Sequence, residues 1–130
     1  MRVSVERDVL ENLRSSGALK EGHFLLSSGR HSDRYVEKFD LLRQPEATSR
    51  ACQGFADAFR DSGVDVVAGP TTGGIILAFE VARQLGVAAA YAERKSEGAG
   101  REFRRGTRFA PGSRVLVVDD ILTTGGAVRE

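Results

Sequence analysis

The sequence predicts an α/β fold in which a parallel β-sheet has flanking helices. Three short segments are continuously apolar, and helical patterns separate them. Strands of continuous rather than alternating hydrophobicity, separated by helices, are typical of a parallel sheet covered on both faces. A chain of 130 residues is also long enough to form a core of its own. We therefore expect a single domain spanning residues 1–130.

The N-terminal half predicts two helices separated by extended segments. The first helix would begin after Ser4 as N-cap and end before Gly17, with an inner face of Val5, Val9, Leu10 and Leu13. Residues 23–39 predict extended segments broken by a Ser-Ser-Gly turn. The second helix would have Pro45 in its first turn and Gly63 after its end. Its inner face is predicted to contain Ala51, Phe55, Ala58 and Phe59.

The remaining elements would form the sheet itself. We expect strands at 64–69, 87–95 and 114–120, and a helix at 75–86 that is closed by Gly86. That helix is so apolar that it should be largely buried. Residues 96–114 are polar, glycine-rich and basic, which predicts a loop or hairpin.

Composition excludes few classes of function. The 19 Lys and Arg nearly balance the 18 Asp and Glu, so net charge indicates no nucleic-acid partner. The one cysteine, Cys52, lies in an apolar helical pattern and is predicted to be a core residue. The N-terminus lacks a signal-peptide pattern, and no apolar run approaches the roughly 18 residues of a membrane span. We expect a soluble, cytoplasmic protein without a membrane or nucleic-acid partner.

Two loops rich in threonine and glycine follow two of the predicted strands. The first Thr-Gly loop is "PTTGG" at 70–74, and the second is "ILTTGGA" at 121–127. Small residues allow backbone N–H groups to converge on an anion, and the following helix adds the positive end of its dipole. Because ligands of open α/β sheets bind at the carboxyl ends of strands, we expect an anion site where both loops meet.

Two carboxylates, Asp119 and Asp120, directly precede the second loop. The familiar phosphate sites do not fit: there is no Gly-Lys-Ser/Thr tripeptide and no Gly-x-Gly-x-x-Gly pattern. In a phosphoacceptor receiver the acid pair opens the domain, whereas only ten residues follow Asp120 here. Ionised carboxylates are acceptors that suit a pair of ribose hydroxyls. The predicted ligand is therefore a sugar phosphate, whose sugar separates its phosphate from the acids.

These motifs resemble those of a known family. "VLVVDDILTTGGAVRE" (115–130) is similar to the phosphoribosyl-pyrophosphate (PRPP) signature of type I phosphoribosyltransferases. Residues 17–42, "AGPTTGGIILA" and "YAERK" resemble, in the same order, segments of the orotate phosphoribosyltransferases. The resemblance covers Gly17 to Glu130 and implies an N-terminal helix and strand hood at 1–42 with a PRPP-binding core at 43–130.

The resemblance implies transfer of phosphoribosyl from PRPP to N1 of orotate, giving orotidine 5′-phosphate and pyrophosphate in pyrimidine biosynthesis. It also implies Mg²⁺, bound mainly through PRPP, and a homodimer. Asp119, Asp120 and Arg94 would be the catalytic residues, and Thr123 and Tyr35 would contact orotate. The implied PRPP-binding residues are Thr72, Gly73, Gly74, Arg94, Lys95, Asp119, Asp120, Ile121, Leu122, Thr123, Thr124, Gly125, Gly126 and Ala127.

The chain departs from that family in several places. Many members carry Lys where this chain has Ser27 and Gly73, and many have a Lys and a His in the mobile loop that are absent here. The chain stops at "GGAVRE", before the further helix, strands and orotate-contacting Arg of family members. We expect a C-terminally short core that is a fragment or is completed by another chain.

The basic segment and two alternative functions remain open. Residues 94–114 contain seven Lys or Arg and two Glu, which would suit a mobile loop that closes over pyrophosphate. Individually, Arg101, Arg104, Arg105 and Arg108 are expected on a solvated β-hairpin without a chemical role, and His23 and His31 are expected to be isolated. The alternatives are a phosphoribosyltransferase for another base and a non-catalytic PRPP-binding regulator on the same fold.

Overall fold

The computed structural model describes residues 2–130, with side chains from residue 6 onward. The chain divides into two compact units, one ending at residue 51 and the other spanning 52–130. The division falls inside helix α3 (Pro45–Phe59). The boundary at residue 42 that the sequence suggests for the hood stays a prediction.

The first unit contains a helix, a β-hairpin and a short second helix. Its elements are α1 (Arg2–Ser15), β1 (Leu19–Leu25), β2 (His31–Val36) and α2 (Lys38–Leu42), followed by the start of α3. The strands β1 and β2 pair antiparallel, and their register shifts between Glu21 and Phe24. The predicted extended segments and the turn between them are confirmed, except that residues 38 and 39 belong to α2, which was not predicted. Helix α1 already includes Ser4, so the prediction of Ser4 as N-cap is wrong.

Small side chains and one amide form the centre of the first unit. Ala18, Leu41, Leu42 and Ala47 are buried, and the buried Asn12 donates a hydrogen bond from Nδ2 to the carbonyl of Ala47 at 2.8 Å. In contrast, the two predicted inner residues Val9 and Leu10 are exposed, and the side chain of Val5 lies outside the described part. The polar Asn12, which the predicted apolar stripe did not include, therefore occupies a buried position instead.

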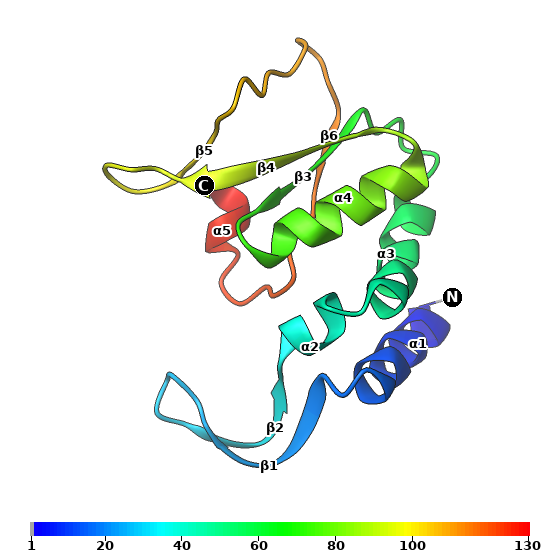
Figure 1. Ribbon diagram of the computed structural model, residues 1–130, viewed down its shortest axis with the longest axis vertical. Helices are drawn as coiled ribbons and strands as arrows, with labels where there is room; N and C mark the ends of the chain where they lie inside the picture. Colours follow the sequence, from blue (N-terminus) through cyan, green and yellow to red (C-terminus); the bar gives the residue numbers. More distant parts are fainter. Residues whose placement is uncertain (1) are drawn as a thin grey trace. The chain divides into compact units, whose positions relative to one another are not determined.

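The second unit is a four-stranded sheet with strand order β5-β4-β3-β6. Its strands are β3 (Val66–Pro70), β4 (Ala88–Arg94), β5 (Arg101–Phe103) and β6 (Val115–Val117). β3 pairs parallel with both β4 and β6, whereas β5 is antiparallel to β4 and was not predicted as a strand. Helix α4 (Gly73–Leu85) runs alongside β3 and β4, and α5 (Gly126–Arg129) ends the chain (Figure 1).

Helix α4 buries one face against the sheet. Leu77, Ala78, Val81 and Ala82 are buried, and the helix ends at Gly86 in the left-handed conformation, as predicted. Phe79 on the opposite face is 67% exposed, so the prediction of a largely buried helix holds for one face only. A single contact with a sheet can cover only one stripe of a helix with 3.6 residues per turn.

Two other predictions of burial are wrong. Phe55 and Phe59 of α3 are exposed, and between residues 51 and 59 the buried positions are Ala56 and Cys52, of which Cys52 was predicted to lie in the core. The side chains of Val115 and Val117 in β6 are also exposed, so the sheet is not covered on both faces at this strand. No helix in residues 2–130 has the length and apolar character needed to cross a membrane.

Cys52 provides a test of the core. Its side chain is 0% exposed, and burial, assisted by the nearby charge of Glu80, raises the pKa of its thiol to about 12. Because the thiolate is the reactive form, we expect no stoichiometric labelling of the folded protein by a disulfide reagent at about pH 8, and full labelling in denaturant. Rapid, complete labelling of the folded chain would show that this part of α3 is not buried.

Candidate functional site

The carboxyl ends of three strands meet at one edge of the second unit. The backbone N–H of Val118, just beyond β6, donates to the carbonyl of Ala68 in β3 at 2.9 Å. The N–H of Thr71, just beyond β3, donates to the carbonyl of Ala92 in β4 at 3.0 Å. Both Thr-Gly loops and the end of β4 therefore start from the same edge, which confirms the placement predicted from the sequence.

The first Thr-Gly loop is closed by two glycines in direct contact. A Cβ atom added to Gly69 would overlap the carbonyl group of Gly74, and one added to Gly74 would lie 2.7 Å from Cδ of Pro70. Thr72 is the N-cap of α4, but its side chain makes no capping hydrogen bond. The backbone N–H groups of Gly73 and Gly74 lie in the first turn of α4, where the helix itself supplies no acceptor, and both glycines are buried.

The paired acids lie between β6 and the second Thr-Gly loop. Asp119 and Asp120 are both half-buried. Oδ1 of Asp119 accepts from the N–H of Asp120 at 2.8 Å, and Oδ1 of Asp120 accepts from the N–H of Ile121 at 2.9 Å. These local bonds fix the orientation of each carboxylate relative to the backbone, since each uses one oxygen of its group.

The second Thr-Gly loop is open to solvent. The side chains of Ile121, Leu122, Thr123 and Thr124 are exposed. Gly125 has φ of 79°, which a residue with a side chain rarely adopts, and it precedes α5. The hydroxyl of Thr124 accepts from the N–H of Gly126 at 3.3 Å. The predicted residues up to Ala127 therefore form an open bend that leads into α5 and exposes both threonine side chains.

The basic segment is a β-hairpin, as expected, but its arginines are mostly paired. Arg105 pairs with Glu93, and this carboxylate raises the pKa of Arg105. Arg104 donates to Glu102 and to the carbonyl of Arg94. Arg94 itself is exposed at the end of β4, followed by Lys95, whose N–H donates to Gly100. The local excess of positive charge is thus smaller than a count of residues suggests.

Arg101 differs from the other arginines. Its side chain is only 8% exposed, and Nη1 donates to the hydroxyl of Thr71 at 2.9 Å. The expectation that Arg101 is solvated is therefore wrong. The sequence held no signal for this contact, because Arg101 and Thr71 are 30 positions apart.

The remaining predicted residues lie in the first unit. Tyr35 is exposed, with its ring centroid 5.7 Å from that of Phe24. His23 and His31 are not isolated as expected, because Nε2 of His23 lies 2.6 Å from Nδ1 of His31. Among residues 2–130, no group of three or more His, Cys, Asp or Glu side chains is arranged to hold a metal ion.

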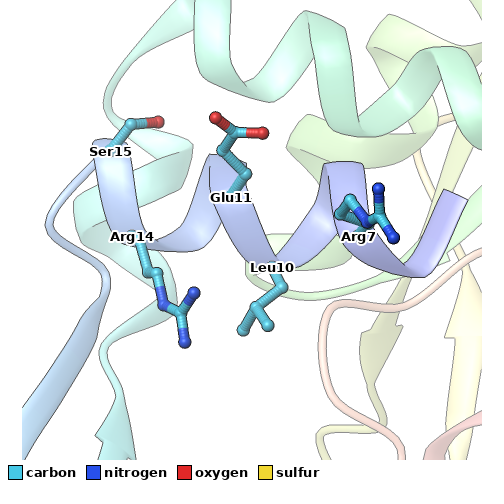
Figure 2. Close-up of a pocket in the computed structure, with 5 residues that line it drawn as sticks. All are labelled: Arg7, Leu10, Glu11, Arg14 and Ser15. Carbon is cyan, nitrogen blue, oxygen red and sulfur yellow. The ribbon is translucent and has the colours of Figure 1, made fainter. Parts of the chain in front are cut away.

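A surface pocket on α1 contains none of the predicted site residues. It is lined by Arg7, Leu10, Glu11, Arg14 and Ser15. In Figure 2, Leu10 and Arg14 project from one side of the helix and Glu11 and Ser15 from the other, so the lining groups do not converge. This pocket therefore offers no alternative site.

A mixed α/β sheet whose three parallel strands bring two Thr-Gly loops and paired acids to one edge is the arrangement from which the sequence predicted a sugar-phosphate site. A family model described as the phosphoribosyl transferase domain matches residues 40–130. The chain belongs to this phosphoribosyltransferase family.

Relatives of known name agree with that membership. Over 123 residues the chain is 49% identical to an orotate phosphoribosyltransferase of Chlorobium phaeobacteroides, covering 94% of this chain and 62% of that protein. The crystal structure of an orotate phosphoribosyltransferase from Aeropyrum pernix superposes with a TM-score of 0.75 at 30% identity, covering 93% and 69%. An adenine phosphoribosyltransferase from Leishmania donovani, at 17% identity and a TM-score of 0.65 over 91% and 58%, shares the fold alone. The chain spans less than two thirds of the length of the curated relatives.

The contact between Gly69 and Gly74 predicts a large effect of a small substitution. Gly69→Ala should lower the free energy of unfolding by about 3 kcal/mol, because the added methyl group forces the loop backbone apart. Chemical denaturation followed by circular dichroism measures this change. Gly126→Ala is the control, since its nearest neighbouring atom lies 3.5 Å from the added Cβ. Equal stability of the two variants would contradict the tight closure.

Proposed function

We propose that this chain carries the PRPP-binding part of an orotate phosphoribosyltransferase. The observation that supports the proposal is the meeting of two Thr-Gly loops and the Asp119–Asp120 pair at one sheet edge. Relatives that share 42–49% of aligned residues are named orotate phosphoribosyltransferase, which favours orotate over another base. The reaction would transfer phosphoribosyl from PRPP to orotate in pyrimidine biosynthesis.

Each part of PRPP has a chemically suitable counterpart. Asp119 and Asp120 would accept hydrogen bonds from the ribose hydroxyls, since ionised carboxylates are acceptors only. The turn from Thr123 to Ala127 would hold the 5′-phosphate through its hydroxyl and amide groups. Thr72, Gly73 and Gly74 would face the pyrophosphate at the start of α4.

The proposed chemistry needs charge stabilisation more than a strong base. The bond between C1′ of the ribose and pyrophosphate breaks, the pyrophosphate keeps the electron pair, and N1 of orotate forms the new bond to C1′. Positive charge develops on the ribose and negative charge on the leaving group. Arg94 and Lys95, at the end of β4, would stabilise the pyrophosphate, and the loops would hold the reactants in line.

Mg²⁺ and a second copy of the chain belong to the proposal. Mg²⁺ retains several waters and binds substrate phosphates, so it would arrive with PRPP and neutralise its pyrophosphate. The half-buried carboxylates of Asp119 and Asp120 fit this role as hard oxygen acceptors for the waters of the ion. We also propose a cytoplasmic homodimer, whose mass can be measured by analytical ultracentrifugation. Tyr35 and Thr123 are the proposed contacts to orotate.

The first experiment is a calorimetric titration of the chain with PRPP and Mg²⁺, followed by orotate in the same cell. We expect PRPP to bind and orotate to be converted to orotidine 5′-phosphate, which absorbance detects. If adenine is turned over when it replaces orotate in the same titration, the chain is a phosphoribosyltransferase for another base. Binding without turnover of any base would favour a regulator or an incomplete enzyme, and no binding would refute the proposal.

The paired acids are tested by the double substitution Asp119→Asn with Asp120→Asn. We expect PRPP binding to weaken at least about tenfold, because a hydrogen bond to a charged group contributes roughly 1.5–3 kcal/mol. Calorimetry measures the dissociation constant, and circular dichroism checks the fold.

The matched control for the paired acids is Asp61→Asn. Asp61 is exposed in the turn before β3, and therefore at the opposite edge of the sheet. Removing its charge should leave PRPP affinity unchanged. If the double variant also binds PRPP as tightly as the parent chain, the assignment of the ribose site to Asp119 and Asp120 is wrong.

A further inference from the structure

Arg101 is a nearly buried cation at the edge where the two Thr-Gly loops meet. It lies on β5, directly opposite Arg94 on β4. Arginine is rarely buried without specific partners, because removing a guanidinium from water is costly. The contacts of Arg101 therefore show which groups compensate the cost of burying its guanidinium.

The guanidinium of Arg101 contacts residues that adjoin both loops. Nη1 donates to the hydroxyl of Thr71 at 2.9 Å and to the carbonyl of the same residue at 3.5 Å. Nε forms an ion pair with Oε2 of Glu130 at 3.3 Å. Thr71 belongs to the first Thr-Gly loop, and Glu130 directly follows α5, which begins in the second loop.

Thr71 is the point at which the first loop leaves β3. Its N–H is bonded to the carbonyl of Ala92, while Arg101 holds its hydroxyl and carbonyl. On the other side, the backbones of Gly69 and Gly74 are already in contact, so the loop cannot close further. The glycine contact and the hydrogen bonds of Arg101 thus both restrict the orientation of residues 72–74. The second restriction depends on the side chain of Arg101 alone.

We infer that Arg101 is a positioning residue that holds the first Thr-Gly loop in its pyrophosphate-binding conformation through Thr71. The inference rests on the proposed function, because it assigns pyrophosphate to that loop. Arg101 need not touch the ligand: it acts through Thr71 and orders the N–H groups at the start of α4 before the ligand arrives. Such preorganisation reduces the cost of ordering on binding and stabilises charge that develops on a leaving group.

The test compares variants of the full 130-residue chain. Arg101→Met removes the donor and the charge, Arg101→Lys retains the charge and one donor group, and Thr71→Val removes the hydroxyl acceptor while keeping the shape. Calorimetry with Mg²⁺ measures the affinity of each variant for inorganic pyrophosphate and for PRPP. Steady-state kinetics with orotate gives separate KM values for the two substrates.

We expect Arg101→Met to weaken pyrophosphate and PRPP binding about tenfold, as loss of a charge-assisted hydrogen bond predicts. KM for PRPP should rise and kcat should fall, while KM for orotate should stay unchanged. Arg101→Lys should recover part of the loss. Adding Thr71→Val to Arg101→Met should cause little further loss, because the two residues act through one contact.

The matched control is Arg108→Met, which removes an exposed positive charge from the same segment. It should leave pyrophosphate affinity unchanged, so a general loss of charge would be recognised by an equal effect of both Met variants. Melting curves identify variants that fail to fold. If Arg101→Met does not fold, Arg101→Lys and Thr71→Val still decide the question.

The inference is overturned if folded Arg101→Met binds pyrophosphate like the parent chain, or if the effects of Arg101→Met and Thr71→Val multiply. Failure of the proposed function gives a different pattern. If the parent chain binds pyrophosphate but does not convert orotate, the proposed activity is refuted. The pyrophosphate affinities of the variants can still be compared in that case. Parent chain that binds neither PRPP nor pyrophosphate would refute both.

Discussion

The candidate site depends on the parallel pairing of β6 with β3. That pairing places Val117 opposite Ala68, and the N–H of Val118 continues it with a bond to the same residue. Because both strands run in one direction, the segments that leave their carboxyl ends start from one edge. An antiparallel β6 would carry the paired acids to the opposite edge. The direction of one three-residue strand therefore decides whether the acids and the first Thr-Gly loop can serve one ligand.

A steric contact and a charged hydrogen-bond donor both restrict the first Thr-Gly loop, which leaves the sheet next to the pairing of β3 with β6. One is the absence of side chains at Gly69 and Gly74, which allows the end of β3 and the start of α4 to touch. The other is the guanidinium of Arg101, whose hydrogen bond to Thr71 compensates part of the cost of its own burial. Close backbone contact limits the loop sterically, and the charged donor orients it. Together they leave the amide groups at the helix start in a defined position.

The positive charge that a ligand would meet at the site depends on ion pairs as well as on the number of basic residues. Glu93 and Glu102 neutralise Arg105 and Arg104 on the hairpin, and solvent reaches the arginine side chain of each pair. These pairs shape the hairpin and contribute little stability. The positive charge available to an anionic ligand is therefore concentrated at the end of β4, where Arg94 and Lys95 follow the sheet edge.

The sequence by itself determined the order of the three parallel strands, the helix between the first two with Gly86 after its end, the two Thr-Gly loops and the acids between them. These features are local, since chain direction, glycine conformation and hydrophobic period act over a few residues. Only the tertiary structure decided that Ala56 rather than Phe55 and Phe59 faces inward, which residues of the hairpin form β5, and that Arg101 reaches Thr71. Each of these depends on which surface another segment presents, and no local pattern encodes a partner 30 residues away.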